Sequence, residues 1–162
     1  MKVLKQQTNS TDCLVCGENN NLGLHANFYE MEDGSVVALA RFKPQHQSYP
    51  NRTHGGMIAS LIDETVGRLL WIKEPNTFAV TSTLTIKYRK PVPYGADLKC
   101  IATMNSNNSR GFTGSAKIVD CQGNVLATGE AIYVKAPIEK ISNRDDYAFL
   151  VEGKAPLDEI DI

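Results

Sequence analysis

The sequence has no apolar run that approaches the about 20 residues needed to cross a bilayer. Its first residues, MKVLKQQTNSTDC, also lack the apolar stretch that follows the lysines of a secretion signal. These absences predict a cytoplasmic protein with no membrane partner.

A charge excess of either sign is absent as well. The 162 residues carry 17 basic and 18 acidic side chains, a net charge of -1, so nothing in the totals indicates a nucleic-acid partner. A chain of this size with 42% hydrophobic residues can bury the core of one domain. We predict a flexible N-terminal segment at 1–12, one domain at 13–136, and a C-terminal tail at 137–162 with a helical turn around 146–151.

Cysteine is scarce, and the four cysteines are expected to be free thiols in a reducing compartment. Cys13 and Cys16 form a C-x-x-C pair, which can be half of a zinc site. No second C-x-x-C or H-x3-H completes four ligands, and no strand-then-helix pattern supports a redox pair. The favoured interpretation is a tight turn through Gly17, with no metal and no cofactor.

Only one long helical pattern is present, from Thr53 or His54 to Ile72, where E-P-N stops it. One stripe at 100° spacing is apolar and should pack on a sheet. It consists of Ile58, Leu61, Ile62, Thr65, Val66 and Leu69. The opposite side carries small residues around one carboxylate, which leaves a groove for a ligand or another backbone. These residues are Gly56, Ala59, Ser60, Asp63 and Gly67.

Alternating apolar and polar residues predict about six strands. The first two form a hairpin around E-D-G. The predicted ranges are 23–29, 35–42, 78–88, 98–104, 112–119 and 125–134. Because one helix cannot cover both faces of a parallel sheet, the predicted class is α+β, a curved antiparallel sheet wrapped around one long central helix.

The segment T-H-G-G-M-I-A-S-L-I-D-E-T-V-G, followed by L-T-I-K-Y-R-K-P-V-P-Y-G, resembles the hot-dog-fold thioesterase superfamily. It is most similar to the phenylacetate-pathway, PaaI-like type, in which H-G-G opens the central helix and an acid follows nine positions after the histidine. The segment C-L-V-C-G-E-N-N-N-L-G-L-H is similar to a lead-in of one branch. The resemblance implies a hot-dog fold, an acyl-CoA substrate, a homodimer or dimer of dimers, and no metal.

Site residues follow from the same resemblance. Asp63 matches the acidic base or nucleophile, Gly55 the amide that polarises the thioester carbonyl, and His54 the neighbouring loop position. Thr81 falls where related enzymes carry a Ser or Thr that helps to hold water. Some relatives have Asn or Gln six residues before the histidine. This chain has Ser48 there, and Asn51 is the candidate substitute.

The residues themselves suit this chemistry. A helix N-terminus offers free N–H groups to a developing oxyanion, and Gly55 and Gly56 let a carbonyl approach closely. Asp63 can take a proton from water or attack the carbonyl directly, and the sequence leaves both routes open. At about 1.5 Å rise per residue, Asp63 lies about 12 Å from the Gly55 amide. We therefore predict two composite sites in a dimer, each shared between protomers.

Several of these residues also have a purely structural interpretation. His54 could simply cap the helix and Thr81 could be an ordinary strand former. Arg89 and Lys90 could bind the phosphates of CoA or be solvated.

Glu64 has Arg68 four residues on, the spacing of an ordinary surface ion pair. His25 and His46 are interpreted as surface residues. Two rival functions are an acyl-thioester hydratase or dehydratase on the same fold, and an acyl-CoA-binding module without turnover.

Overall fold

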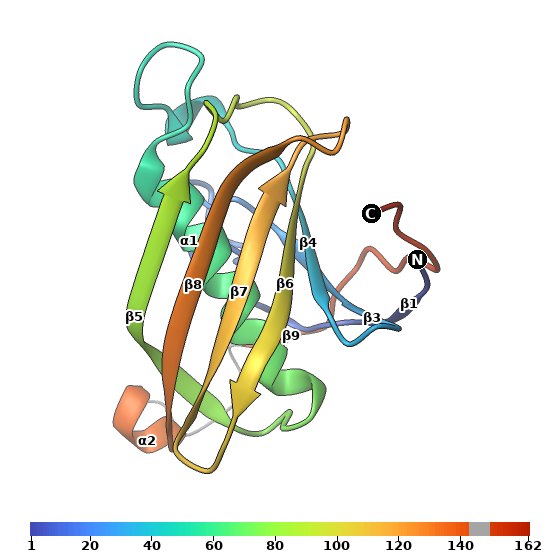
Figure 1. Ribbon diagram of the computed structural model, residues 1–162, viewed down its shortest axis with the longest axis vertical. Helices are drawn as coiled ribbons and strands as arrows, with labels where there is room; N and C mark the ends of the chain where they lie inside the picture. The colour runs from blue at the N-terminus through green and yellow to red at the C-terminus, as the bar shows by residue number, and fades with distance from the viewer. Residues whose placement is uncertain (143–149) are drawn as a thin grey trace.

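The computed structural model describes residues 1–142 and 150–162. A curved sheet wraps around helix α1, which lies along one face (Figure 1). The sheet order is β1-β3-β4-β6-β7-β8-β5, and each neighbouring pair is antiparallel. The strands are β1 (Val3–Gln6), β3 (Asn27–Met31), β4 (Val36–Ala40), β5 (Phe78–Tyr88), β6 (Leu98–Asn107), β7 (Gly111–Val119) and β8 (Val125–Ala136). This confirms the predicted α+β class and hot-dog architecture.

The central helix has the predicted extent. α1 (Gly55–Gly67) continues without a break into the 3₁₀ segment η2 (Arg68–Ile72). The predicted apolar stripe is buried against the sheet. Glycines on β7 and β8 allow this close packing, because a Cβ at Gly129 would lie 2.6 Å from Ile62 Cγ2. Among the described residues, no helix combines the length and apolar character that spanning a bilayer requires.

The N-terminal residues differ from the flexible segment that the sequence predicted over 1–12. β1 pairs with β3, so the described part of the chain forms a sheet of seven strands rather than about six. β2 (Asn9–Ser10) pairs with β9 (Leu150–Val151). The reason is tertiary: Val3 is buried in a small second core with Tyr29 and Ile160, whereas the next apolar residue, Leu4, is exposed.

The two chain ends lie side by side (Figure 1), and Lys2 forms a β-bridge with Glu159. The tail contains a short helix α2 (Ile138–Ile141). Of the helical turn expected around 146–151, residues 146–149 lie outside the described part. The remainder, Leu150–Val151, is the strand β9 rather than a helix.

The first predicted hairpin is confirmed, with shifted ends. Its turn places Gly34 at φ 81°, a conformation that glycine adopts without strain. Residues 23–26 are not part of the strand, because the amides of Leu24 and Ala26 donate to the carbonyls of Leu14 and Val15. β4 leads into the 3₁₀ turn η1 (Pro44–His46).

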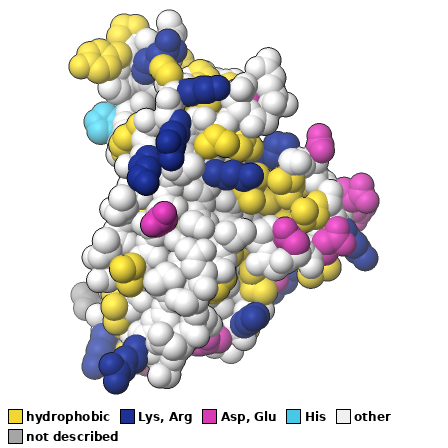
Figure 2. Space-filling model, viewed as in Figure 1, with side chains coloured by type: hydrophobic (Ala, Val, Ile, Leu, Met, Phe, Trp, Pro, Cys, Tyr) yellow, Lys and Arg dark blue, Asp and Glu magenta, His cyan; other side chains and the backbone are white. Residues whose placement is uncertain are grey.

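Figure 2 looks onto the face of the sheet that is turned away from α1. Uncharged polar side chains dominate its centre, and Lys and Arg side chains gather above them. A hollow of about 620 Å³ on this side has hydroxyl-bearing and cationic residues in its lining. They include Thr85, Thr103, Ser115, Thr128, Lys87, Arg89 and Lys117. The helix face therefore contains the larger apolar core, and the outer side carries only the smaller one.

Candidate active site

The Asp63 carboxylate lies between the helix and two strands of the sheet. The Thr81 hydroxyl on β5 donates to Asp63 Oδ1 at 2.8 Å, and the Tyr133 hydroxyl on β8 donates to the same oxygen at 2.6 Å. The structure thus brings together Asp63 and Thr81, two of the predicted site residues, and adds a third. One carboxylate with two hydroxyls is a donor set suited to orienting water, and it offers few ligands to a metal.

Tyr133 was not predicted. Its ring stacks on Phe112 with centroids 4.6 Å apart, which fixes the phenol beside Asp63. Burial, together with the hydrogen bond to Asp63, raises the pKa of Tyr133, so the phenol stays protonated at neutral pH and acts as a donor. In the sequence Tyr133 occupies an inward position of an alternating strand, where a tyrosine that only packs in the core would fit equally well. Only the fold distinguishes a packing role from a hydrogen bond to the Asp63 carboxylate.

A cavity of about 360 Å³ opens beside Asp63. Its polar side includes Asp63, Glu64, Arg68, Thr81 and Tyr133. Its apolar side is formed by Gly67, Leu70, Trp71, Phe78, Ala79 and Val80. Trp71 and Phe78 meet edge to face at 5.9 Å. The cavity therefore combines a carboxylate with apolar lining residues, an arrangement suited to a ligand with an apolar tail.

At the start of α1, His54 is the N-cap residue. Its Nδ1 accepts the amide hydrogen of Gly56 at 2.9 Å, so the Gly56 amide is engaged and does not offer a second free donor as predicted. The imidazole reaches this amide because His54 itself is extended and its side chain folds back over the first turn. Among the described residues no acceptor binds the Gly55 amide, which leaves one free N–H at this helix end.

A second cavity, of about 460 Å³, adjoins Gly55. The Tyr88 hydroxyl donates to the Gly55 carbonyl at 2.9 Å and forms part of the wall. Other lining residues are Ser48, Tyr49, Arg52, Thr53, Ile58, Arg89, Lys90, Pro91 and Val92. Three cationic side chains thus line the same cavity as Gly55.

Asn51, the predicted substitute for the missing carbonyl donor, is not part of this lining. Its Oδ1 accepts a hydrogen bond from the Tyr94 hydroxyl at 3.3 Å, and its backbone has φ 60°. Ser48 does line the cavity. Lys90 Nζ donates to Asn124 Oδ1 at 3.2 Å, so part of its hydrogen-bonding capacity is already used.

The acid and the free amide lie in separate cavities of one protomer. Within residues 1–142 and 150–162, none lines both the Asp63 cavity and the Gly55 cavity. This separation agrees with the about 12 Å that the helix rise predicts between the two positions. A single chain therefore does not place Asp63 against the Gly55 amide.

Two sequence-based interpretations of charged residues are wrong. Glu64 and Arg68 do form an ion pair at 2.9 Å, but Arg68 is only 4% exposed, and its guanidinium lies 4.2 Å from the Phe28 ring centroid. The arginine is buried because the N-terminal residues cover this side of the helix. His46 is also buried, within 2.7 Å of the Leu22 carbonyl through Nε2.

The family model "Thioesterase superfamily" matches residues 51–127. The acyl-coenzyme A thioesterase THEM4 of Mus musculus is 30% identical over 122 residues, which are 72% of this chain and 50% of that protein. The chain spans half the length or less of the curated relatives that it matches.

Two solved structures show the same fold. The thioesterase superfamily protein RHA08564 superposes with a TM-score of 0.69 at 26% identity, covering 75% of this chain and 62% of that one. The PaaI protein of the E. coli phenylacetic acid degradation operon has a TM-score of 0.63 at 21% identity, covering 70% and 80% of the two chains.

Proposed function

We propose that this chain is an acyl-CoA thioesterase of the thioesterase superfamily, which hydrolyses a thioester to a free carboxylic acid and CoA. The match of the superfamily model to residues 51–127 supports this proposal. The observation that carries the proposal is the Asp63 carboxylate, held by Thr81 and Tyr133 at the wall of an apolar cavity. The name of the mouse relative supports the acyl-CoA substrate. The cytoplasmic location stays a prediction from the sequence.

In the proposed reaction, Asp63 takes a proton from the attacking water, and the C–S bond breaks to release CoA as a thiolate that receives this proton. Alternatively, Asp63 attacks the thioester carbon and expels the CoA thiolate, which gives an anhydride; water then hydrolyses the anhydride and supplies the proton of the thiol. Thr81 and Tyr133 both donate to Oδ1, which fixes the carboxylate and leaves Oδ2 to contact the reactant. The acyl chain would occupy the apolar part of the cavity, against Trp71 and Phe78.

The negative charge on the carbonyl oxygen needs a donor, and the Gly55 amide is the free N–H available at the helix start. It adds the positive end of the helix dipole. Because this amide and Asp63 lie in separate cavities, we propose that each complete site combines Asp63 of one protomer with Gly55 of another.

The edge strand supports such a dimer. β5 is 11 residues long, forms one edge of the sheet, and is largely exposed. A long open edge is normally paired or covered. Asp63 lies beside Thr81 near one end of β5, and Gly55 beside Tyr88 at the other end. A twofold axis near the Leu84–Thr85 peptide would pair two β5 strands antiparallel, with Thr81 of one protomer opposite Tyr88 of its partner.

The cations around Gly55 fit the other part of the substrate. Arg52, Arg89 and Lys90 line the same cavity as Gly55, where a thioester carbonyl would be held. The phosphate groups of CoA are anions that guanidinium and ammonium groups bind by charge-assisted hydrogen bonds. We therefore propose that CoA enters across this basic end of the helix, with its acyl group directed toward the apolar cavity of the other protomer.

A thiol-release assay over short, medium, long and aromatic acyl-CoAs tests the proposal. We expect hydrolysis of at least one thioester, and we expect Asp63→Asn to lower kcat by about two orders of magnitude or more, as loss of a positioned base does. Equal rates for the two proteins would remove Asp63 from the mechanism. Tight acyl-CoA binding without thiol release would indicate a binding module, and hydration of an enoyl thioester would indicate the hydratase alternative.

A further inference from the structure

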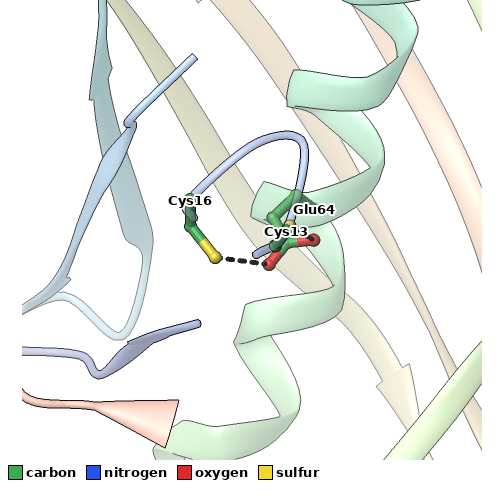
Figure 3. A group of neighbouring side chains, drawn as sticks. All are labelled: Cys13, Cys16 and Glu64. Carbon is green, nitrogen blue, oxygen red and sulfur yellow. Dashed lines mark hydrogen bonds between the residues drawn. The ribbon is translucent and has the colours of Figure 1, made fainter. Parts of the chain in front are cut away.

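Three side chains with metal-binding atoms converge on the side of α1 that the N-terminal loop covers. Cys13, Cys16 and Glu64 point toward one another (Figure 3), and their ligand atoms all lie within 4.8 Å of one another. Cys16 Sγ is 3.8 Å from Glu64 Oε1, and Cys13 Sγ is 4.0 Å from Glu64 Oε2. Each carboxylate oxygen thus faces one sulfur.

These separations are close to those of a tetrahedral zinc site. With zinc–sulfur bonds of about 2.3 Å and zinc–oxygen bonds of about 2.0 Å, sulfur and oxygen ligands lie about 3.5 Å apart. The two observed sulfur–oxygen distances, 3.8 and 4.0 Å, exceed this value by a few tenths of an ångström. A cation at the centre would therefore draw the ligands together without a rearrangement of the backbone.

Hydrogen-bond donors already point at both sulfurs. The Val15 amide donates to Cys13 Sγ at 3.3 Å, and the Ser10 amide donates to Cys16 Sγ at the same distance. The Arg68 guanidinium donates to Cys16 Sγ at 3.0 Å. A neutral thiol is a weak acceptor, whereas metal-bound thiolates are typically supported by such donors.

The charges also balance. Two thiolates and the Glu64 carboxylate together supply the negative charge. A divalent cation and the Arg68 guanidinium together supply an equal positive charge. Arg68 also donates to Glu64 Oε1 at 2.9 Å, so it contacts two of the three ligands and orients both. A partly buried cluster of this kind is favourable when its charges compensate one another.

We propose that Cys13, Cys16 and Glu64 bind a zinc ion, with the fourth coordination position open to water. The open coordination position would face a cavity of about 430 Å³, which all three residues line. The ion would join the N-terminal loop to α1 at the residue next to Asp63. A redox disulfide between the two cysteines is the competing use, but it gives no role to a carboxylate that faces both sulfurs.

Cobalt(II) is a direct probe, because thiolate ligands give it an intense near-ultraviolet charge-transfer band. Full-length protein is reduced, stripped with a chelator and titrated with cobalt and then with zinc. We expect saturation at about one equivalent per chain and displacement of cobalt by zinc. Cys13→Ser and Cys16→Ser should abolish the band, and Glu64→Gln should weaken binding by about tenfold or more.

Cys121→Ser is the matched control, because Cys121 is an exposed thiol outside the cluster. It should bind cobalt as the unaltered protein does. The proposal fails if the unaltered protein shows no saturable charge-transfer band, if Cys16→Ser keeps it, or if the cysteines only form a disulfide with diamide and bind no metal. If circular dichroism shows that the cysteine variants do not fold, the metal titrations of the unaltered protein and of Glu64→Gln still test the proposal. The readout is independent of thioester hydrolysis.

Discussion

At the scale of single residues, Asp63 depends on two hydroxyl donors that differ in burial. Tyr133→Phe removes one donor and keeps the ring that stacks on Phe112. A hydrogen bond to a charged group contributes about 1.5–3 kcal/mol, so kcat should fall by about tenfold to a hundredfold while KM changes little. Steady-state thiol release measures both constants.

Thr81→Val is the matched comparison, since it removes the other donor to the same oxygen at nearly constant volume. Thermal melting of both variants separates a local effect from a loss of folded protein. A Tyr133→Phe enzyme with unchanged kcat would mean that Tyr133 only packs beside the site.

At the scale of the helix, the free Gly55 amide can be removed without breaking α1. Proline is well tolerated at the first helical position, and the preceding residue, His54, already has the extended conformation that proline requires. Gly55→Pro should therefore keep the fold and lower kcat by about 10²- to 10³-fold, the cost of losing one oxyanion donor. Thiol release and circular dichroism together test this prediction.

Gly55→Ala is the control for added bulk. A Cβ at this position would lie 3.1 Å from the Tyr88 hydroxyl in either variant, but alanine retains the N–H. If Gly55→Ala is as inactive as Gly55→Pro, crowding against Tyr88 rather than the amide explains the loss.

At the scale of the whole molecule, shared sites predict complementation. Asp63→Asn and Gly55→Pro protomers are each inactive as homodimers, but a mixed dimer contains one site with both Asp63 and the Gly55 amide intact. After denaturation and refolding of an equal mixture, activity should return to about one quarter of the unaltered value, because half of the dimers are mixed and half of their sites are complete.

The control mixes each variant with itself under the same refolding conditions. Sedimentation should show a dimer or larger assembly in every sample. A monomeric active enzyme, or a mixture no more active than its components, would contradict composite sites.

The sequence by itself determined the central helix, its apolar stripe and most strands. These features follow from local signals, since side-chain periodicity and the H-G-G start act within a few residues of one another. The H-G-G segment did not reveal that the His54 ring occupies the Gly56 amide, because that depends on a side-chain rotamer.

Tertiary structure decided the rest. β1 joins the sheet through contacts with residues distant in sequence, and Tyr133 meets Asp63 across a separation of 70 residues. The C-x-x-C pair lacked a further ligand in the sequence because Glu64 follows Cys16 by 48 residues and belongs to another element. Such contacts depend on how the helix is seated on the sheet, which no short-range pattern encodes.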